Sequence, residues 1–370
     1  MAVIPIKAGG KEHQLGGERV FIVAEIGKNY IQTKEDRPTE EYLENAKKLI
    51  DAAAEAGVDA VKFQTHEVGD EIHPNVSFSS PHFPAGERYE WTLRNTKATP
   101  VSFWRALKEH AESRGLVFFS TPMSRAAAEK LDQVGMSFWK VGSADVRDYV
   151  LLNHHIKTGK PIIISTGMVS LSELDQVVKY LKDHGVNFSI LYCISKYPAP
   201  KESFNLATIE YLREKYPDAP IGFSDHSVGE MNLTLAAVKL GAKIIEKHFS
   251  FSREFWGSDH KVSMTPAKMK ELVRVIRSGD YKTVNQKPYY GAKDRELEGA
   301  TNSLRPLWEK SLVAGRNIKA GELVTENMIF AVRPRAHVPG LPANRFHDVI
   351  GKRATRDLKK YDPVSEDDIA

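Results

Sequence analysis

Two histidines end two successive apolar runs of the sequence, and each shares its run with a hydroxyl or an acid. In PIGFSDHS, Ser224 and His226 are two residues apart, as are Glu246 and His248 in KIIEKHFS. Side chains two apart on a strand point to the same face. If the runs are neighbouring strands, both imidazoles can bind one divalent cation and leave its other positions to water or substrate oxygen. The alternative is that each histidine only makes a polar contact at the rim of the sheet.

Two lysines occupy similar places in other apolar runs. Lys62 lies in AVKFQT, with Gln64 two residues later, and Lys140 ends the run before Gly142. A buried lysine costs several kcal/mol unless an anion pairs with it, so we expect an anionic substrate. Hydroxyls at the ends of the intervening runs suit a group with many acceptor oxygens, such as phosphate. They are Thr121, Ser143, Ser165, Ser195 and Ser224.

The lysines and the hydroxyls also have interpretations that involve no substrate. The lysines can extend to solvent or pair with Glu25 or Glu246, and each hydroxyl can cap the helix that follows it. A lysine in a dry site can also act as a nucleophile and form a Schiff base, as in an aldolase. Two lysines beside two candidate metal ligands favour electrostatic binding of an anion over a single lysine that acts as a nucleophile.

Eight β-branched and aromatic runs must position these side chains, and segments with helical spacing separate them. The runs are 21–27, 60–65, 116–122, 137–143, 161–167, 188–195, 220–227 and 243–250. Apolar strands alternating with helices predict an α/β fold with a parallel sheet, and eight units close a (β/α)8 TIM barrel. An open doubly wound sheet is the competing fold. The barrel is favoured because nearly every run ends in polar residues, and a barrel brings all these ends to one mouth.

The rest of the chain falls into shorter parts. Residues 66–100 are too long for an ordinary βα loop and predict a lid or an interface loop. We predict a barrel domain over 1–280, a polar linker over 281–309 and a small β-rich domain over 310–370. A unit of about 60 residues is marginally stable alone, so we expect the last one to dock.

Composition excludes several classes of protein. The chain has 370 residues, 41% hydrophobic and 27% charged, with a net charge of +4, which indicates a globular protein and not a disordered one. The single cysteine, Cys193, cannot form an intramolecular disulfide. The sequence contains neither a membrane-length apolar run nor a secretory leader, so we expect a cytoplasmic protein that does not bind membranes. Without a block of Lys and Arg, we expect no nucleic-acid partner.

Many segments, in order, resemble one family. The chain resembles the sialic acid synthases, phosphoenolpyruvate-dependent enzymes that make nonulosonic acids. The matching segments are AEIGKN, AVKFQTH, FFSTPMS, WKVGSAD, KPIIISTGM, LYCISKYPAP, IGFSDHS, IIEKHF and GSDHKVSM. The C-terminal SLVAGRNIKAGELVTENMI, followed by VRP, is similar to the family's antifreeze-like (SAF) domain.

The resemblance implies a reaction and its alternatives. Phosphoenolpyruvate would condense with N-acetylmannosamine and water to give sialic acid and phosphate. The same chemistry on another acceptor would give legionaminic or pseudaminic acid, or would use the phosphorylated sugar. A catalytically inactive sugar- or phosphate-binding scaffold is the alternative from another class. The intact His226, His248, Lys62 and Lys140 argue against that alternative.

The resemblance also implies a role for each residue. His226 and His248 are similar to the ligands of a divalent metal, most often Mn²⁺, with Mg²⁺ or Co²⁺ as alternatives. The implied catalytic residues are Glu25, Asp145, Glu246 and Asp259. The implied substrate-binding residues are Lys62, Gln64, Thr121, Lys140, Ser143, Ser165, Ser195, Tyr197, Ser224 and Arg333. Arg333 resembles an arginine that reaches a partner subunit's site and holds the N-acyl group of the sugar, which implies a domain-swapped homodimer.

Three positions depart from the family pattern. Tyr30 stands where relatives usually have His, Asp145 where many have Glu, and Ser195 where some have Asn. The first two changes affect the expected sugar-facing half of the site more than the phosphoenolpyruvate half.

Overall fold

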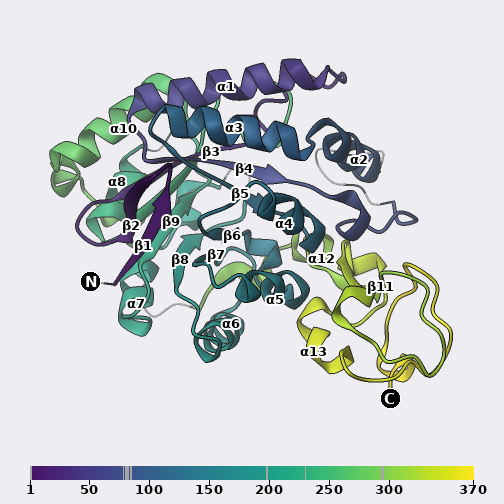
Figure 1. The fold of residues 1–370 in the computed structure, drawn as a ribbon. Coiled ribbons are helices and arrows are strands. Elements are labelled where there is room, and N and C mark those ends of the chain that lie inside the picture. The colour runs from purple at the N-terminus through teal and green to yellow at the C-terminus, as the bar shows by residue number, and fades with distance from the viewer. Residues whose placement is uncertain are drawn as a thin grey trace.

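The computed structural model describes residues 2–370 except 78, 80–82, 84, 85, 197, 198, 230 and 293–295. Tyr197, predicted to bind substrate, therefore lies outside the described residues. Figure 1 shows a closed sheet surrounded by helices, with a small C-terminal domain, in yellow, attached at one side.

Eight parallel strands form the central sheet, in the order β5-β4-β3-β10-β9-β8-β7-β6. β6 also lies beside β5, so the sheet closes into a barrel. The predicted TIM barrel is therefore confirmed. The strands are β3 (Phe21–Gly27), β4 (Ala60–Thr65), β5 (Val117–Pro122), β6 (Trp139–Val141), β7 (Ile162–Ser165), β8 (Phe188–Cys193), β9 (Ile221–Asp225) and β10 (Ile244–His248).

An outer layer of helices covers the strands because each helix has one apolar face. In α1, the buried positions Tyr42, Ala46, Leu49 and Ala53 recur at helical spacing, and the helix ends at Gly57 with φ 82°. The layer comprises α1 (Thr39–Ala56), α3 (Val101–Ser113), α4 (Arg125–Asp132), α5 (Tyr149–Lys157), α6 (Leu171–Asp183), α7 (Ala207–Lys215), α8 (Met231–Lys239) and α10 (Pro266–Ser278).

A hairpin closes the end of the barrel where the strands begin, and the sequence analysis did not predict it. β1 (Val3–Ala8) pairs antiparallel with β2 (Lys11–Gly16), and alternate residues of β1 are buried. Gly16 lies against Pro220 before β9, and the Lys7 carbonyl accepts a hydrogen bond from Ser137 before β6. The hairpin therefore covers the amino-terminal ends of the strands and leaves their carboxyl ends open.

The described part of the segment 66–100, predicted to be a lid or an interface loop, contacts the C-terminal domain. It contains α2 (Arg88–Ala98) and a 3₁₀ turn over Val68–Asp70. Immediately after this turn, Ile72 forms a parallel bridge with Arg333 of the C-terminal domain. The Arg333 amide donates to the Glu71 carbonyl at 2.9 Å, and the His73 amide donates to the Arg333 carbonyl at 3.0 Å.

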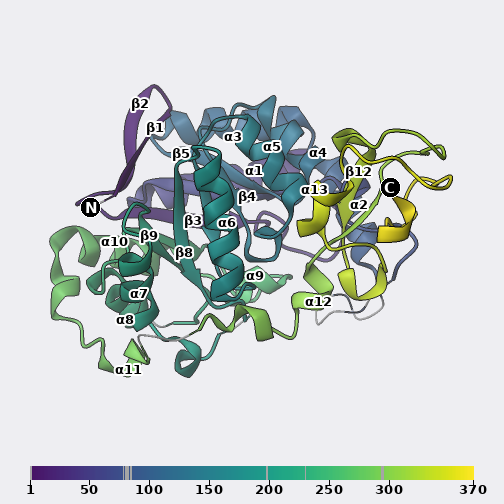
Figure 2. The ribbon, with the colours of Figure 1, turned by 90° about the horizontal axis from the view of Figure 1, so that it is seen from below.

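The C-terminal domain is built on a short antiparallel pair, β11 (Ser311–Ala314) and β12 (Ile329–Val332), followed by α13 (Phe346–Val349). Its apolar core includes Leu312 and Phe346 and also takes in Val150 of α5. Figure 2 shows the domain beside α5. The expected docking of this unit onto the barrel is therefore present within one chain.

The last part of the linker lies at the carboxyl ends of the strands. It contains α11 (Lys287–Tyr290) and α12 (Arg305–Trp308), and the short α9 (Ser258–Lys261) lies earlier, after β10. Asn302 donates to the Ser195 carbonyl at 2.8 Å, which fixes the linker to the loop after β8. Among the described residues, no helix has the length and apolar character required to cross a membrane.

Candidate active site

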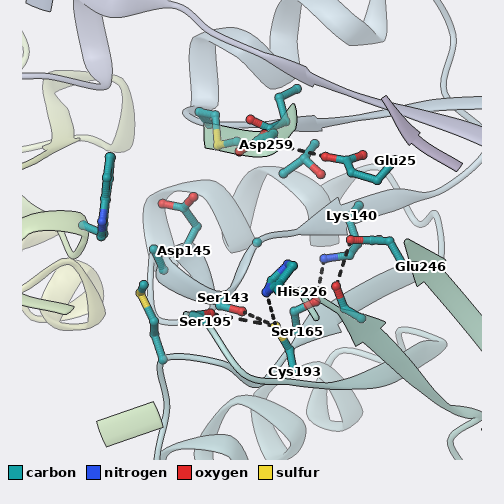
Figure 3. A pocket seen from close by; sticks show the side chains of 18 of the residues that line it. Glu25, Lys140, Ser143, Asp145, Ser165, Cys193, Ser195, His226, Glu246 and Asp259 are labelled. Carbon is teal, nitrogen blue, oxygen red and sulfur yellow. Dashed lines mark hydrogen bonds between the residues drawn. The ribbon is translucent and has the colours of Figure 1, made fainter. Parts of the chain in front are cut away.

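The carboxyl ends of the barrel strands surround a cavity of about 270 Å³ (Figure 3). All the predicted site residues within the described part of the chain line this cavity. They are Glu25, Lys62, Gln64, Thr121, Lys140, Ser143, Asp145, Ser165, Ser195, Ser224, His226, Glu246, His248, Asp259 and Arg333.

The pleat of the strands decides which side chains enter the cavity. β9 and β10 pair in register, with Glu246 beside Ser224 and Lys247 beside Asp225. Glu246 and Ser224 face the cavity and hydrogen-bond at 3.2 Å. Lys247 and Asp225 do not line it but form a separate buried ion pair at 3.1 Å. The alternation used to predict the site is therefore observed.

The two histidines meet at the ends of these strands. The ring centroids of His226 and His248 are 5.3 Å apart. Nδ1 of His226 donates to the Ile194 carbonyl at 2.9 Å, so a neutral His226 carries its lone pair on Nε2. Burial lowers the pKa of His248 to about 3, so this ring is neutral near pH 7. Although burial lowers the pKa of His226, Cys193 and the Ile194 carbonyl raise it above its usual range, so this ring takes up a proton more readily than His248. When both rings are neutral, two imidazoles on one wall are a donor set that fits a divalent transition-metal cation.

The arrangement also limits how such a cation would be bound. In the part of the chain that the structure describes, no group of three or more His, Cys, Asp or Glu side chains is placed to hold a metal. A cation held by His226 and His248, with its other positions open to water or substrate, stays the prediction made from the sequence.

The two buried lysines have different surroundings. Lys62 contacts Glu25 at 2.8 Å and Glu246 at 3.5 Å, and these carboxylates raise its pKa even though burial lowers it. Lys140 donates to the Ser165 hydroxyl at 2.7 Å and to the Val141 carbonyl at 3.0 Å. No described carboxylate makes an ion pair with Lys140, and burial lowers its pKa.

The hydroxyls of Ser143 and Ser195 lie close to Gly167. A Cβ atom on Gly167 would lie 2.1 Å from the Ser195 hydroxyl and 2.8 Å from the Ser143 hydroxyl. The Gly167 amide donates to Ser143 at 3.1 Å. Only a residue without a side chain fits here, so the loop after β7 brings its backbone close to the hydroxyls. This combination of an amide, hydroxyls and a buried ammonium group suits a phosphate or carboxylate.

The two buried carboxylates beside Lys62 differ in proton affinity. Burial raises the pKa of Glu25 to about 7, with Lys62 opposing the shift and Glu246 adding to it. For Glu246, burial acts in the same direction, but Lys62 and Lys140 outweigh it and hold its pKa at about 2. Glu25 can therefore exchange a proton near neutral pH while Glu246 stays ionised.

Arg333 enters the site of its own chain. Its Nη2 donates to Asp145 at 2.6 Å, and Lys310 contacts the same carboxylate at 2.9 Å. Within this chain, the bridge to Ile72 holds Arg333 over its own barrel. The expectation that it reaches a partner's site in a domain-swapped homodimer stays a prediction.

Several cavity residues were missed by the sequence analysis. They are Lys28, Arg88, Met123, Ala144, Met168, Cys193, Ser258, Leu304 and Trp308. Lys28 directly follows the first barrel strand, so its position was a readable signal. Arg88 and Trp308 lie outside the strand-helix pattern and reach the cavity only through the packing of α2 and α12.

Tyr30, a departure from the expected pattern, does not line this cavity. Its ring packs among Tyr42, Phe63 and Phe103 beneath the helices. The substitution therefore affects the packing around the barrel and leaves the cavity wall as described.

A closed parallel barrel, with a cavity of buried lysines, carboxylates and histidines at the carboxyl ends of its strands, is the architecture of a barrel enzyme. Residues 49–286 match the model of the NeuB family, and residues 309–370 match that of the SAF domain. The chain belongs to the NeuB family and carries a C-terminal SAF domain, which confirms the resemblance.

Three relatives illustrate the range of the family. Human N-acetylneuraminate-9-phosphate synthase is 30% identical over 95% of this chain and 94% of its own length. The N,N'-diacetyllegionaminic acid synthase of Campylobacter jejuni is 31% identical, over 94% of this chain and 100% of its own. The crystal structure of spore coat polysaccharide biosynthesis protein SpsE of Bacillus subtilis matches with a TM-score of 0.76 at 31% identity, covering 99% of both chains.

Proposed function

We propose that this chain condenses phosphoenolpyruvate with an N-acylated mannosamine-type aldehyde sugar and water, giving a nonulosonic acid and phosphate. N-acetylmannosamine is the acceptor that the sequence analysis favoured, with the legionaminic, pseudaminic and sugar-phosphate reactions as alternatives. The observation that carries the proposal is the buried Lys140, which makes no ion pair with a described carboxylate, donates to the Ser165 hydroxyl and lines the same cavity as His226 and His248.

Phosphoenolpyruvate fits the inner half of the cavity. A buried ammonium group without a counter-ion is costly, and a substrate phosphate or carboxylate would remove that cost. Ser143, Ser165 and Ser195 supply hydroxyls for the remaining acceptor oxygens, and Lys62 adds a second cation. Binding would therefore fix both ends of the enol and leave its carbon 3 directed to the outer half.

The carboxylates support the bond-forming chemistry. When carbon 3 attacks the aldehyde carbon, positive charge develops at carbon 2 of the enol. The ionised Glu246 lowers the energy of that charge, and Glu25 can accept a proton from the water that adds there. Addition of water to carbon 2 gives a tetrahedral centre, and phosphate leaves when the carbon–oxygen bond breaks.

We also propose that the reaction depends on a divalent metal, with Mn²⁺ the expected ion. His226 and His248 would hold it, and it would supply Lewis-acid polarisation of the aldehyde oxygen. Gln64 donates to Glu25 at 2.9 Å and approaches Asp259 at 3.4 Å. This contact orients the two acids toward the space where the aldehyde would lie.

A phosphate-release assay tests the proposal. Purified enzyme with Mn²⁺ and phosphoenolpyruvate is given a panel of mannosamine-like and bacillosamine-derived sugars, and the product is identified by mass. We expect phosphate release only when an acceptor sugar is present. Inactivation by borohydride, with no phosphate released for any sugar, would instead indicate a lysine Schiff base.

A further inference from the structure

A buried ion pair lies next to the two histidines, on the opposite face of their strands. Asp225 immediately precedes His226, and Lys247 immediately precedes His248. Asp225 is 0% exposed and Lys247 is 1% exposed, and neither lines the active-site cavity. Replacing a buried ion pair by apolar residues is often neutral or stabilising, so stability alone gives little reason for this one. Its place beside both imidazoles points to a role in the site.

The sheet does not fix His226 directly. β9 ends at Asp225, so His226 lies one residue beyond the strand, whereas His248 is the last residue of β10. The ring of His226 donates to the Ile194 carbonyl, and its own carbonyl accepts from the Ala199 amide at 3.2 Å. Both of these contacts come from the loop after β8. They therefore do not set the distance between His226 and β10, which carries the other imidazole.

The ion pair makes that connection through Ser227, the residue after His226. Asp225 accepts a hydrogen bond from the Ser227 amide at 2.7 Å, and Lys247 donates to the Ser227 carbonyl at 2.6 Å. Thr234 of α8 donates to the other carboxylate oxygen of Asp225 at 2.5 Å, which fixes the carboxylate in turn. Both chain neighbours of His226 are therefore bound to a single ammonium group, and that group belongs to β10.

We propose that Asp225 and Lys247 are positioning residues, which set the distance between His226 and His248 and thereby the affinity of the site for a divalent cation. This inference rests on the proposed function, because it assumes that the two imidazoles bind a metal. Charge-assisted hydrogen bonds are short and directional, so the pair is a stiff connection. Groups that orient metal ligands without touching the metal typically contribute about 10- to 100-fold to its affinity.

The alternative is a role in folding only. The pair would then hold β9 and β10 together, and its loss would lower the melting temperature with no specific effect on metal binding. Phosphoenolpyruvate separates the two roles, because Lys140 and Ser165, proposed to bind it, come from β6 and β7. A positioning role predicts a loss of metal affinity without a loss of affinity for this anion.

The test measures Mn²⁺ binding in the absence of substrate. Enzyme treated with EDTA and then freed of the chelator is titrated with MnCl₂, and free Mn²⁺ is followed by its electron paramagnetic resonance signal. Binding of phosphoenolpyruvate without metal is measured by calorimetry. In Lys247→Met, the Kd for Mn²⁺ should rise by about 10- to 100-fold. The Kd for phosphoenolpyruvate should stay within about twofold of the wild-type value.

Two further variants keep the test decisive. Asp225→Asn removes the charge but keeps an acceptor for Thr234, so it should fold even if Lys247→Met does not, and it should raise the Kd for Mn²⁺ by about tenfold. Leu107→Ala removes a buried side chain of α3, which packs on β5, and β4 and β3 separate β5 from β10. It should lower the melting temperature and leave the Kd for Mn²⁺ within about twofold.

An unchanged Kd for Mn²⁺ in the folded ion-pair variants would overturn the positioning inference and leave the synthase proposal intact. An equal loss of Mn²⁺ affinity in Leu107→Ala, or a parallel loss of phosphoenolpyruvate binding in the ion-pair variants, would overturn it as well, because general damage would then explain the effect. Wild-type enzyme that binds Mn²⁺ no more tightly than His226→Ala would instead overturn the proposed metal site itself, and this inference with it.

Discussion

The two buried lysines of the cavity should respond to the same substitution in opposite ways. Replacing either Lys140 or Lys62 by Met should abolish measurable phosphate release, because each supplies a cation for phosphoenolpyruvate. In the enzyme without substrate or metal, however, Lys140→Met should raise the free energy of unfolding, and Lys62→Met should lower it.

The magnitudes follow from the partners of each lysine. Lys140→Met loses two hydrogen bonds worth about 1 kcal/mol each and the attraction of Glu246, but it removes an ion whose burial costs several kcal/mol, so we expect a small net gain on the order of 1 kcal/mol. Lys62→Met leaves Glu25 and Glu246 as a buried like-charge pair and should cost about 3–5 kcal/mol.

Urea unfolding of both variants and the wild type at pH 8 measures these differences. At pH 6, a proton on Glu25 relieves the repulsion with Glu246, so the loss in Lys62→Met should be smaller than at pH 8. A Lys140→Met enzyme that is destabilised by as much as Lys62→Met would show that Lys140 is paired in the fold and would refute the argument for an anionic substrate there.

Three further predictions concern the proton, the metal and the C-terminal domain. As the pH increases, kcat/KM for the acceptor should rise through a pKa near 7, the pKa of Glu25. Glu25→Gln should remove this rise and lower the rate by about 10²- to 10⁴-fold. If the variant's pH profile kept the same inflection, the proton would belong to another group. EDTA should abolish phosphate release and Mn²⁺ should restore it. His226→Ala should remain inactive with Mn²⁺, while its melting temperature stays within a few degrees of wild type. Unchanged activity in His226→Ala would remove the assignment of His226 as a metal ligand. A mixture of Arg333→Ala and Lys140→Ala chains should remain inactive if Arg333 acts through the Asp145 of its own chain, the contact that the structure has; recovered activity would show that the domains exchange between subunits.

The barrel and its inner site were predictable because both rest on local patterns. The runs 21–27 and 60–65 coincide with β3 and β4, since continuous apolar stretches bounded by polar residues define buried strands. The spacing of Glu246 and His248 then fixed which residues face the cavity, because the strand period is two.

The outer half was less predictable because tertiary packing creates it. Trp308 comes from a polar linker, and only the contacts of that linker with the barrel bring it over the mouth. Arg88 follows no strand and reaches the cavity through α2. The resemblance identified Arg333 as a site residue, but only the structure showed the bridge to Ile72 by which it can reach the cavity of its own chain.

The most direct test of the central claim is the fate of the water oxygen. The reaction is run in ¹⁸O-labelled water with phosphoenolpyruvate, Mn²⁺ and an acceptor found by the panel, and the products are analysed promptly by mass spectrometry, with acceptor and product incubated alone in labelled water as exchange controls. If this cavity joins the enol to the aldehyde and adds water at carbon 2, the nine-carbon acid gains label beyond those controls and the released phosphate contains none. Labelled phosphate without a combined carbon skeleton would show simple hydrolysis and would contradict the account.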